Sequence, residues 1–173
     1  LSGSARLVYD QVIPNPDFNQ LGDACEYLKN ANAEVIIALG GGSVIDTAKV
    51  LAVGMNGFEA IKVHLASTGK SDLPQEAIPI IAVPTTAGTR SEVTKWATVW
   101  DTETSKKYSL SRFDLYPSDA VIDPELMVNL PRDLTIATGL DALSHALESI
   151  WNINANPISD TYAITAAKKI LVD

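Results

Sequence analysis

Apolar runs and helical spacings alternate along the first 130 residues. Residues 6–13 are rich in β-branched and aromatic side chains and end at prolines, which predicts a strand. Residues 35–39 and 78–83 are continuous apolar runs, typical of parallel strands that are covered on both faces. Residues 120–122 predict a further short strand. Strands separated by helical segments indicate an α/β unit.

Helical spacing appears after the first and second predicted strands. One apolar face recurs at helical intervals through Phe18, Leu21, Ala24, Cys25 and Leu28. A second helix follows the glycines at 40–42, and the polar residues 55–77 predict a loop with one short helix. Residues 94–100 and 107–111 alternate around a polar turn, which predicts a β-hairpin.

From Pro131 onward the pattern is helical only. We therefore expect an α/β region over residues 1–130, joined to the first helices of an all-helical domain over 131–173.

Composition narrows the possible functions. The chain has 173 residues, of which 13 are basic and 21 acidic, and its net charge of −8 disfavours nucleic acid or an anionic membrane as partner. Its apolar stretches are too short for a spanning helix. The single Cys25 excludes an internal disulfide, and its apolar neighbours predict a core position. Two histidines are few for an enzyme that relies on histidine chemistry.

Three glycines and a serine, residues 40–43, lie between a predicted buried strand and a helix. Glycines let the backbone approach a ligand, and the helix N-terminus favours a phosphate or pyrophosphate. The common dinucleotide fingerprint G-x-G-x-x-G fails, because Ile45 stands at its sixth position. Alternatively, Ser43 caps the helix and Asp46 completes a capping box.

Threonines follow the next buried strand, at positions 85, 86, 89 and 94. Hydroxyl groups at the carboxyl end of a parallel strand suit a nucleotide site. The alternative is a solvated loop with local hydroxyl-to-backbone bonds.

Asp141 and His145 are four residues apart on a predicted helix, so they share one face. Such a pair can bind a divalent metal, or it can form a plain hydrogen bond on the helix surface. The other histidine, His64, is expected at the surface of the loop between the strands.

Four segments together resemble the group III, iron-dependent alcohol dehydrogenases. They are GGGSVIDTAK (40–49), PTTAGTRSEVT (84–94), IDPELMVNLP (122–131) and TGLDALSHALES (138–149). The resemblance implies a Rossmann-like nucleotide-binding sheet followed by a helical metal-binding domain. It also implies hydride transfer between an alcohol or aldehyde and NAD or NADP, with Fe²⁺ or Zn²⁺. The motif TGLDALSHALES, together with PTTAGT, argues against a glycerol dehydrogenase or a sugar-phosphate cyclase.

The resemblance also assigns residues. It implies that Gly41, Gly42 and Ser43 contact the pyrophosphate, and we include Asp46 of the same motif in the cofactor site. It places Thr85, Thr86, Thr89 and Thr94 along the nucleotide, Lys107 near the ribose, and Asp141 and His145 among four metal ligands.

This chain departs from the family pattern in three ways. Arg90 replaces a small residue, where it could block the cofactor groove or pair with a phosphate. The two later histidine ligands have no counterpart, and the family's first strands lie upstream of Leu1. We therefore expect an incomplete, cytoplasmic oxidoreductase or, alternatively, a non-catalytic nucleotide-binding or assembly fragment. Uncovered apolar helix faces at 139–150 and 160–172 predict homo-oligomers or association through these helices.

Overall fold

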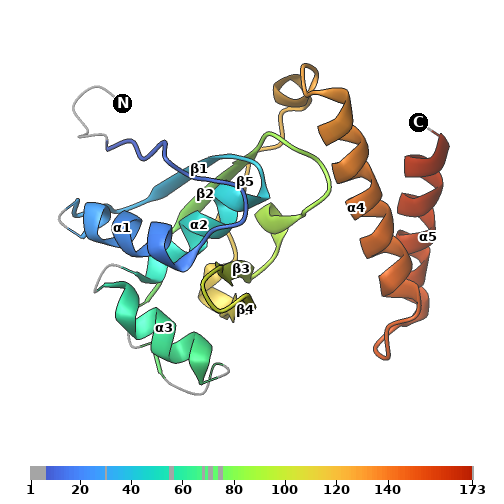
Figure 1. Cartoon of the computed structure of the whole chain (residues 1–173). Helices are drawn as coiled ribbons and strands as arrows, with labels where there is room; N and C mark the ends of the chain where they lie inside the picture. Colours follow the sequence, from blue (N-terminus) through green and yellow to red (C-terminus); the bar gives the residue numbers. More distant parts are fainter. Residues whose placement is uncertain are drawn as a thin grey trace. The chain divides into compact units, whose positions relative to one another are not determined.

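The computed structural model places three of the predicted strands in a parallel sheet (Figure 1). Its strands are β1 (Ile36–Gly40), β2 (Ile80–Pro84) and β5 (Asp119–Ala120), in the order β1-β2-β5. Ile36 pairs with Ile80, and the register continues to Gly40 opposite Pro84. The chain therefore leaves β1 and β2 at the same edge of the sheet.

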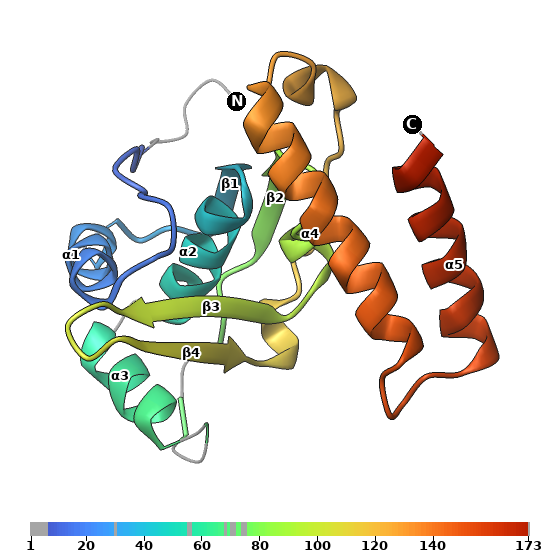
Figure 2. The ribbon, with the colours of Figure 1, turned by 45° about the vertical axis from the view of Figure 1, so that its right-hand side comes forward.

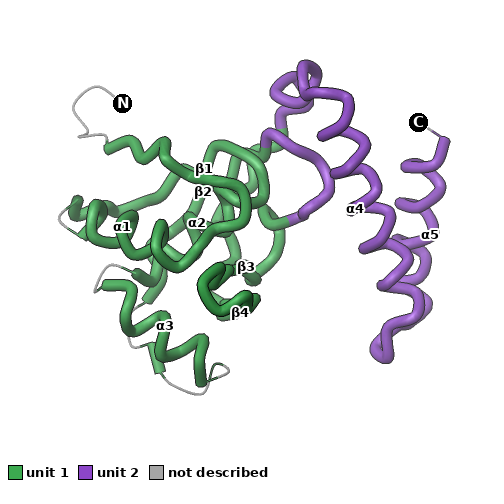
Figure 3. The backbone as a smooth tube through the Cα atoms, viewed as in Figure 1, with its two compact units in different colours: residues 1–84, 91–122 green, residues 85–90, 123–173 purple. Residues whose placement is uncertain are grey.

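The structure describes residues 7–29, 31–54, 57–67, 69, 72–73 and 76–172. The chain divides into two compact units, as Figure 3 shows. Unit 1 comprises the chain up to Pro84 together with Ser91–Ile122, and unit 2 comprises Thr85–Arg90 and the chain from Asp123 onward. The domain boundary near residue 130 stays a prediction, because these units describe only packing within this chain.

Three helices belong to unit 1: α1 (Phe18–Leu28), α2 (Gly42–Val53) and α3 (Phe58–Ala66). The last is the short helix expected within 55–77, a segment of which residues 55–56, 68, 70–71 and 74–75 lie outside the described residues. Helix α2 contacts α1, β1, β2 and β3, and every residue from Thr47 to Val53 is buried. An α-helix that is apolar on almost all sides is stable only inside a core, which explains its central position.

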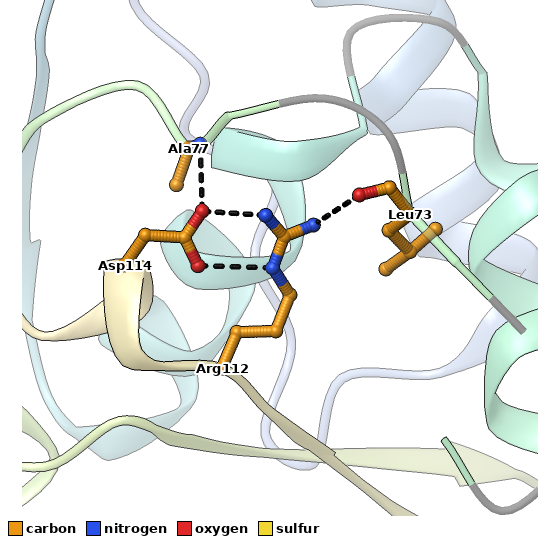
Figure 4. Close-up of polar contacts among 4 residues, drawn as sticks. All are labelled: Leu73, Ala77, Arg112 and Asp114. Carbon is orange, nitrogen blue, oxygen red and sulfur yellow. Dashed lines mark hydrogen bonds and ion pairs between the residues drawn. The ribbon is translucent and has the colours of Figure 1, made fainter. Parts of the chain in front are cut away.

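The predicted hairpin is confirmed as β3 (Trp96–Asp101) and β4 (Lys106–Ser111), which Figure 2 shows side by side. Short 3₁₀ turns flank it, η1 (Ser91–Val93) before β3 and η2 (Phe113–Leu115) after β4. At η2 the Arg112 guanidinium donates to both carboxylate oxygens of Asp114 and to the carbonyl of Leu73 (Figure 4). Asp114 also accepts from the N–H of Ala77 at 3.1 Å, so this cluster fastens the segment before β2.

Unit 2 contains the 3₁₀ turn η3 (Pro124–Met127) and the helices α4 (Arg132–Ile150) and α5 (Pro157–Val172). The two helices pack against each other, and their buried side chains are Ala146, Ala163 and Ala167. Small side chains allow close approach of the helices but bury little apolar area. None of the described helices is long and apolar enough to cross a membrane.

Two expectations about the sheet region are wrong. Residues 7–13 form no strand, and residue 6 lies outside the described residues. Instead, the carbonyls of Val8 and Gln11 accept hydrogen bonds from Tyr27 and Gln20 of α1. Strand β1 is also not covered on both faces: Ala38 is 2% exposed, whereas Ile37 is 62% exposed. Helix α2 packs on one face, and the described residues leave the other face open.

The expected surface position of His64 in a loop is also wrong. His64 lies in α3 and is buried on the same side as Ile61 and Leu65, because its position continues the inward helical face. The expected core position of Cys25 is confirmed, and burial raises the pKa of its thiol to about 12.

Candidate functional site

The glycine turn lies at the point where β1 ends and α2 begins. Helix α2 starts at Gly42 with Gly41 as its N-cap, and no side chain caps it. A Cβ on Gly40 would lie 2.5 Å from Cγ2 of Val44, so only glycine fits there. The uncapped N–H groups of the first turn carry the partial positive charge that binds phosphate.

The capping-box alternative is contradicted by the structure. The Ser43 hydroxyl accepts a hydrogen bond from the N–H of Asn15 at 3.1 Å, rather than capping α2. Asn15 has a φ of 60°, a left-handed conformation that asparagine tolerates better than most residues. Asn15 was not among the residues predicted from the sequence, although its position between Pro14 and Pro16 was an available signal.

Asp46 connects α2 to the hairpin. Its carboxylate accepts from the Ser91 hydroxyl at 2.6 Å and from the N–H of Thr98 at 2.8 Å. Burial raises the pKa of Asp46, although these hydrogen bonds and the nearby charges of Lys49 and Lys107 oppose the shift. In this structure Asp46 holds the elements around the glycine turn in place.

Lys49, one turn further along α2, is fully buried and was not predicted as a site residue either. Its ammonium donates to the Ser91 carbonyl at 2.7 Å, to the Ser91 hydroxyl at 2.8 Å and to the Trp96 carbonyl at 2.7 Å. It also lies 3.4 Å from the Thr94 hydroxyl. The signal in the sequence was a charged pair three residues apart, Asp46 and Lys49, in a helix with no other charged residue.

The predicted cofactor residues divide between the two units. Thr94 lies in unit 1 and turns its hydroxyl toward Lys49. Lys107, in the same unit, is exposed at the start of β4 with its ammonium 5.4 Å from the centre of the Trp100 ring. Thr85, Thr86 and Thr89 lie in unit 2. Their roles toward a nucleotide stay predictions.

The threonine loop, residues 85–90, packs directly on α4. A Cβ on Gly88 would lie 2.3 Å from the Thr138 carbonyl oxygen, and the φ of Gly88 is 110°. Only glycine permits this close backbone approach. The loop is therefore held against the helix that carries Asp141 and His145.

Asp141 and His145 share one face of α4, as their spacing predicts. Oδ2 of Asp141 lies 3.7 Å from Nε2 of His145, and the two side chains are 46% and 43% exposed. An oxygen and an imidazole nitrogen that converge at the surface fit two positions of a metal site. Among the described residues, no group of three or more His, Cys, Asp or Glu side chains could hold a metal ion.

Each unit has a cavity or hollow among its described residues. In unit 1, a cavity of about 750 Å³ lies between residues 8–15 and α1 and contains none of the predicted site residues. Its lining includes Asp10, Asp17 and Asp23, which disfavours an anionic ligand. In unit 2, a hollow of about 440 Å³ contains both Arg90 and His145.

Comparison with protein families gives two matches that together span most of the chain. The family described as iron-containing alcohol dehydrogenase matches residues 2–124. The C-terminal part of the Fe-containing alcohol dehydrogenase family matches residues 135–173.

Individual relatives agree with the family matches. A choline dehydrogenase of Bacillus subtilis is 36% identical over 165 residues, which are 95% of this chain and 41% of that protein. An NAD-dependent methanol dehydrogenase of Bacillus methanolicus is 36% identical over 163 residues, 94% of this chain and 42% of that protein. The chain thus spans about two fifths of the length of these relatives.

Solved structures show the same fold. The sulfoacetaldehyde reductase of Bifidobacterium kashiwanohense in complex with NAD⁺ superposes with a TM-score of 0.89 at 34% identity, over 99% of this chain and 45% of that chain. An alcohol dehydrogenase from Oenococcus oeni gives a TM-score of 0.86 at 36% identity, over 98% of this chain and 43% of that chain.

Proposed function

Because the chain belongs to the iron-containing alcohol dehydrogenase family, we propose that it forms part of a metal-dependent alcohol or aldehyde oxidoreductase. This enzyme exchanges hydride with NAD or NADP. The observation that carries the proposal is the uncapped N-terminus of α2 behind a turn in which Gly40 has no room for a side chain. This turn supplies backbone N–H groups for a pyrophosphate. A cytoplasmic location stays a prediction from the sequence.

In this proposal the residues of unit 1 form and support the phosphate-binding turn. Ser43 joins the turn to Asn15, while Asp46 and Lys49 fix the hairpin and Thr94 beside α2. Thr94 and Lys107 contribute a hydroxyl and a positive charge for the rest of the nucleotide. When bound, the nicotinamide cofactor supplies the hydride chemistry.

In unit 2, Asp141 and His145 supply two metal ligands. A bound Fe²⁺ or Zn²⁺ supplies Lewis-acid polarisation of the substrate oxygen. The Asp141 carboxylate lies 3.7 Å from Nε2 of His145, so the two groups are close enough to bind one ion. Thr85, Thr86 and Thr89 supply hydroxyl groups on the loop that packs on the same helix.

A second candidate function is a nucleotide-binding or assembly module without catalysis. It is favoured by the small number of metal ligands. Structural and catalytic metal sites use three or four protein ligands, whereas the described residues bring together only two. We expect negligible turnover by this chain alone, even with added Fe²⁺ or Zn²⁺.

Calorimetric titration with NAD⁺, NADH, NADP⁺ and NADPH tests the proposal. We expect binding by the wild-type chain and at least a tenfold loss with Ser43→Asp, because the added carboxylate repels the pyrophosphate. Ser43→Asn is the matched control, since it keeps an acceptor for Asn15 and adds no charge. Absence of binding by the wild type would refute the oxidoreductase proposal and the nucleotide-binding form of the second candidate.

Metal titration and turnover separate the two candidates. We expect Zn²⁺ to bind weakly and His145→Gln to abolish that binding without changing the affinity for dinucleotides. Dinucleotide binding together with Zn²⁺ binding that His145→Gln abolishes supports the oxidoreductase even without turnover, whereas dinucleotide binding with no metal affinity supports the non-catalytic module.

A further inference from the structure

Arg90 and His145 both line the hollow in unit 2. Its other lining residues include Glu148, Asn152, Asn154 and Ser159, from α4, the following loop and α5. All of these residues belong to unit 2, so the hollow is formed by one packed body. Apart from Glu148, these side chains offer hydrogen-bond donors.

The backbone at Arg90 is unusual. Its φ is 52°, in the left-handed region that non-glycine residues adopt only at an energetic cost. The neighbouring Gly88 is locked against the Thr138 carbonyl, so the loop cannot relax freely. Strained positions of this kind concentrate at ligand sites, where the strain directs a side chain.

The guanidinium of Arg90 forms no hydrogen bond or ion pair with any residue that the structure describes. The acid in the hollow, Glu148, instead accepts from the Ser144 hydroxyl at 3.2 Å. Asp141, on the same helix, faces His145. A planar guanidinium with its donors unused suits bidentate binding of an oxyanion.

We propose that Arg90 binds an acidic substituent of the substrate, such as a sulfonate, phosphonate or carboxylate group. This inference rests on the proposed oxidoreductase function, in which the reacting oxygen lies near His145. Because Arg90 and His145 line one hollow, a short alcohol or aldehyde places its reacting oxygen toward His145 and its anionic group toward Arg90. The substrate class is therefore a small anionic aldehyde and its alcohol.

Oxyanions also occur in the cofactor, so the test must separate the two sources. The probe for the substrate is 2-hydroxyethanesulfonate, with propan-1-ol as its neutral counterpart, and the probe for the cofactor is ADP. The readout is the side-chain Nε–H signal of Arg90 in NMR spectra. The chain has four arginines, and the signal that disappears in Arg90→Lys assigns it.

We expect 2-hydroxyethanesulfonate to shift the Arg90 signal and propan-1-ol to leave it unchanged. Arg90→Gly should weaken binding of the sulfonate at least tenfold. Glycine is the suitable replacement because it adopts the left-handed backbone without strain. Arg90→Lys should retain part of the affinity, because it keeps the charge but loses the planar fork.

The inference is overturned if wild type and Arg90→Gly bind the sulfonate equally. It is also overturned if ADP shifts the Arg90 signal and the sulfonate does not, which would assign Arg90 to a cofactor phosphate. These measurements need neither metal nor turnover. Failure of the dinucleotide titrations with Ser43 variants would refute the proposed function independently of this result.

Discussion

Lys49 carries a positive charge in the interior of unit 1. Its side chain has no exposed surface, and four oxygens from residues 91–96 surround the ammonium. Burial lowers the pKa of Lys49 to about 8, despite the opposing effect of the Asp46 and Glu92 carboxylates. The ammonium thus holds the segment before β3 to α2 at an electrostatic cost.

The stability of the chain should therefore depend on the protonation of Lys49. Between pH 8 and 10.5 the folded form loses this proton while the unfolded form keeps it. The unfolded state then binds more protons, so the free energy of unfolding contributed by Lys49 rises with pH across this interval, by roughly 3 kcal/mol. The measurement is urea denaturation of wild type and Lys49→Met at several pH values.

The difference in free energy of unfolding between the two proteins isolates the effect of Lys49 from that of other titratable groups. Cys25, for example, stays protonated in the folded state well above its ordinary pKa, which lowers stability at high pH in both proteins. We expect the free energy of unfolding of the wild type to rise relative to that of Lys49→Met as the pH rises above 8. A difference that stays constant would contradict a lowered pKa for Lys49.

A residue's role can be predicted from the sequence when it depends on residues nearby in the sequence. Cys25 follows from its helical spacing, and the Asp141–His145 pair follows from its four-residue separation. The contacts of Asp46 and Lys49 could not be assigned, because their partners lie 42 to 52 residues away. Only the fold brings Ser91 and Thr98 to α2.

At the scale of elements, the contact between residues 85–90 and α4 depends on one glycine. Gly88→Ala places a Cβ 2.3 Å from a backbone oxygen and imposes a φ of 110° on alanine. We expect a loss of about 2–3 kcal/mol in the free energy of unfolding. Circular dichroism during urea denaturation measures it.

Gly139→Ala is the matched control on the same helix. The structure shows open space around a Cβ at Gly139, which lies inside α4. Alanine should raise stability there by about 0.5–1 kcal/mol, through its higher helix propensity. Equal effects of the two substitutions would show that Gly88 does not pack on Thr138 as described.

Most helices and strands follow from the pattern of the sequence. The runs at 35–39 and 78–83 became β1 and β2, shifted by one or two residues, and the hairpin and the two C-terminal helices are confirmed. The predicted strand at 6–13 is wrong because β-branched content does not specify a pairing partner. There the backbone bonds instead to side chains of α1, which no local pattern reveals.

At the scale of the whole chain, large apolar surfaces stay open in both units. On the sheet, Ile37 and Leu39 are 62% and 60% exposed, and on α5 Tyr162 and Leu171 are 74% and 71% exposed. This confirms that the helix faces predicted at 139–150 and 160–172 are incompletely covered. Exposed apolar side chains of this kind favour association.

We expect the chain to elute above its monomer mass in size-exclusion chromatography with light scattering. Replacing two exposed apolar side chains of α5, in Tyr162→Lys/Leu171→Lys, should shift the population toward monomer. Thr165→Lys adds a charge at an exposed polar position of α5 and should leave the distribution unchanged. A wild-type chain that is monomeric at all concentrations would refute the expectation.

The burial of Lys49 also determines how the chain reacts with acylating reagents. A lysine with a pKa of about 8 has far more neutral, nucleophilic amine at physiological pH than an ordinary lysine. The burial that lowers this pKa also withholds the amine from solvent, so acylation requires the hairpin to separate from α2, and separation returns the amine to an ordinary lysine pKa. Once acylated, Lys49 can no longer occupy its site among the oxygens of residues 91–96. An acylated Lys49 therefore reports that unit 1 has opened in the presence of the reagent.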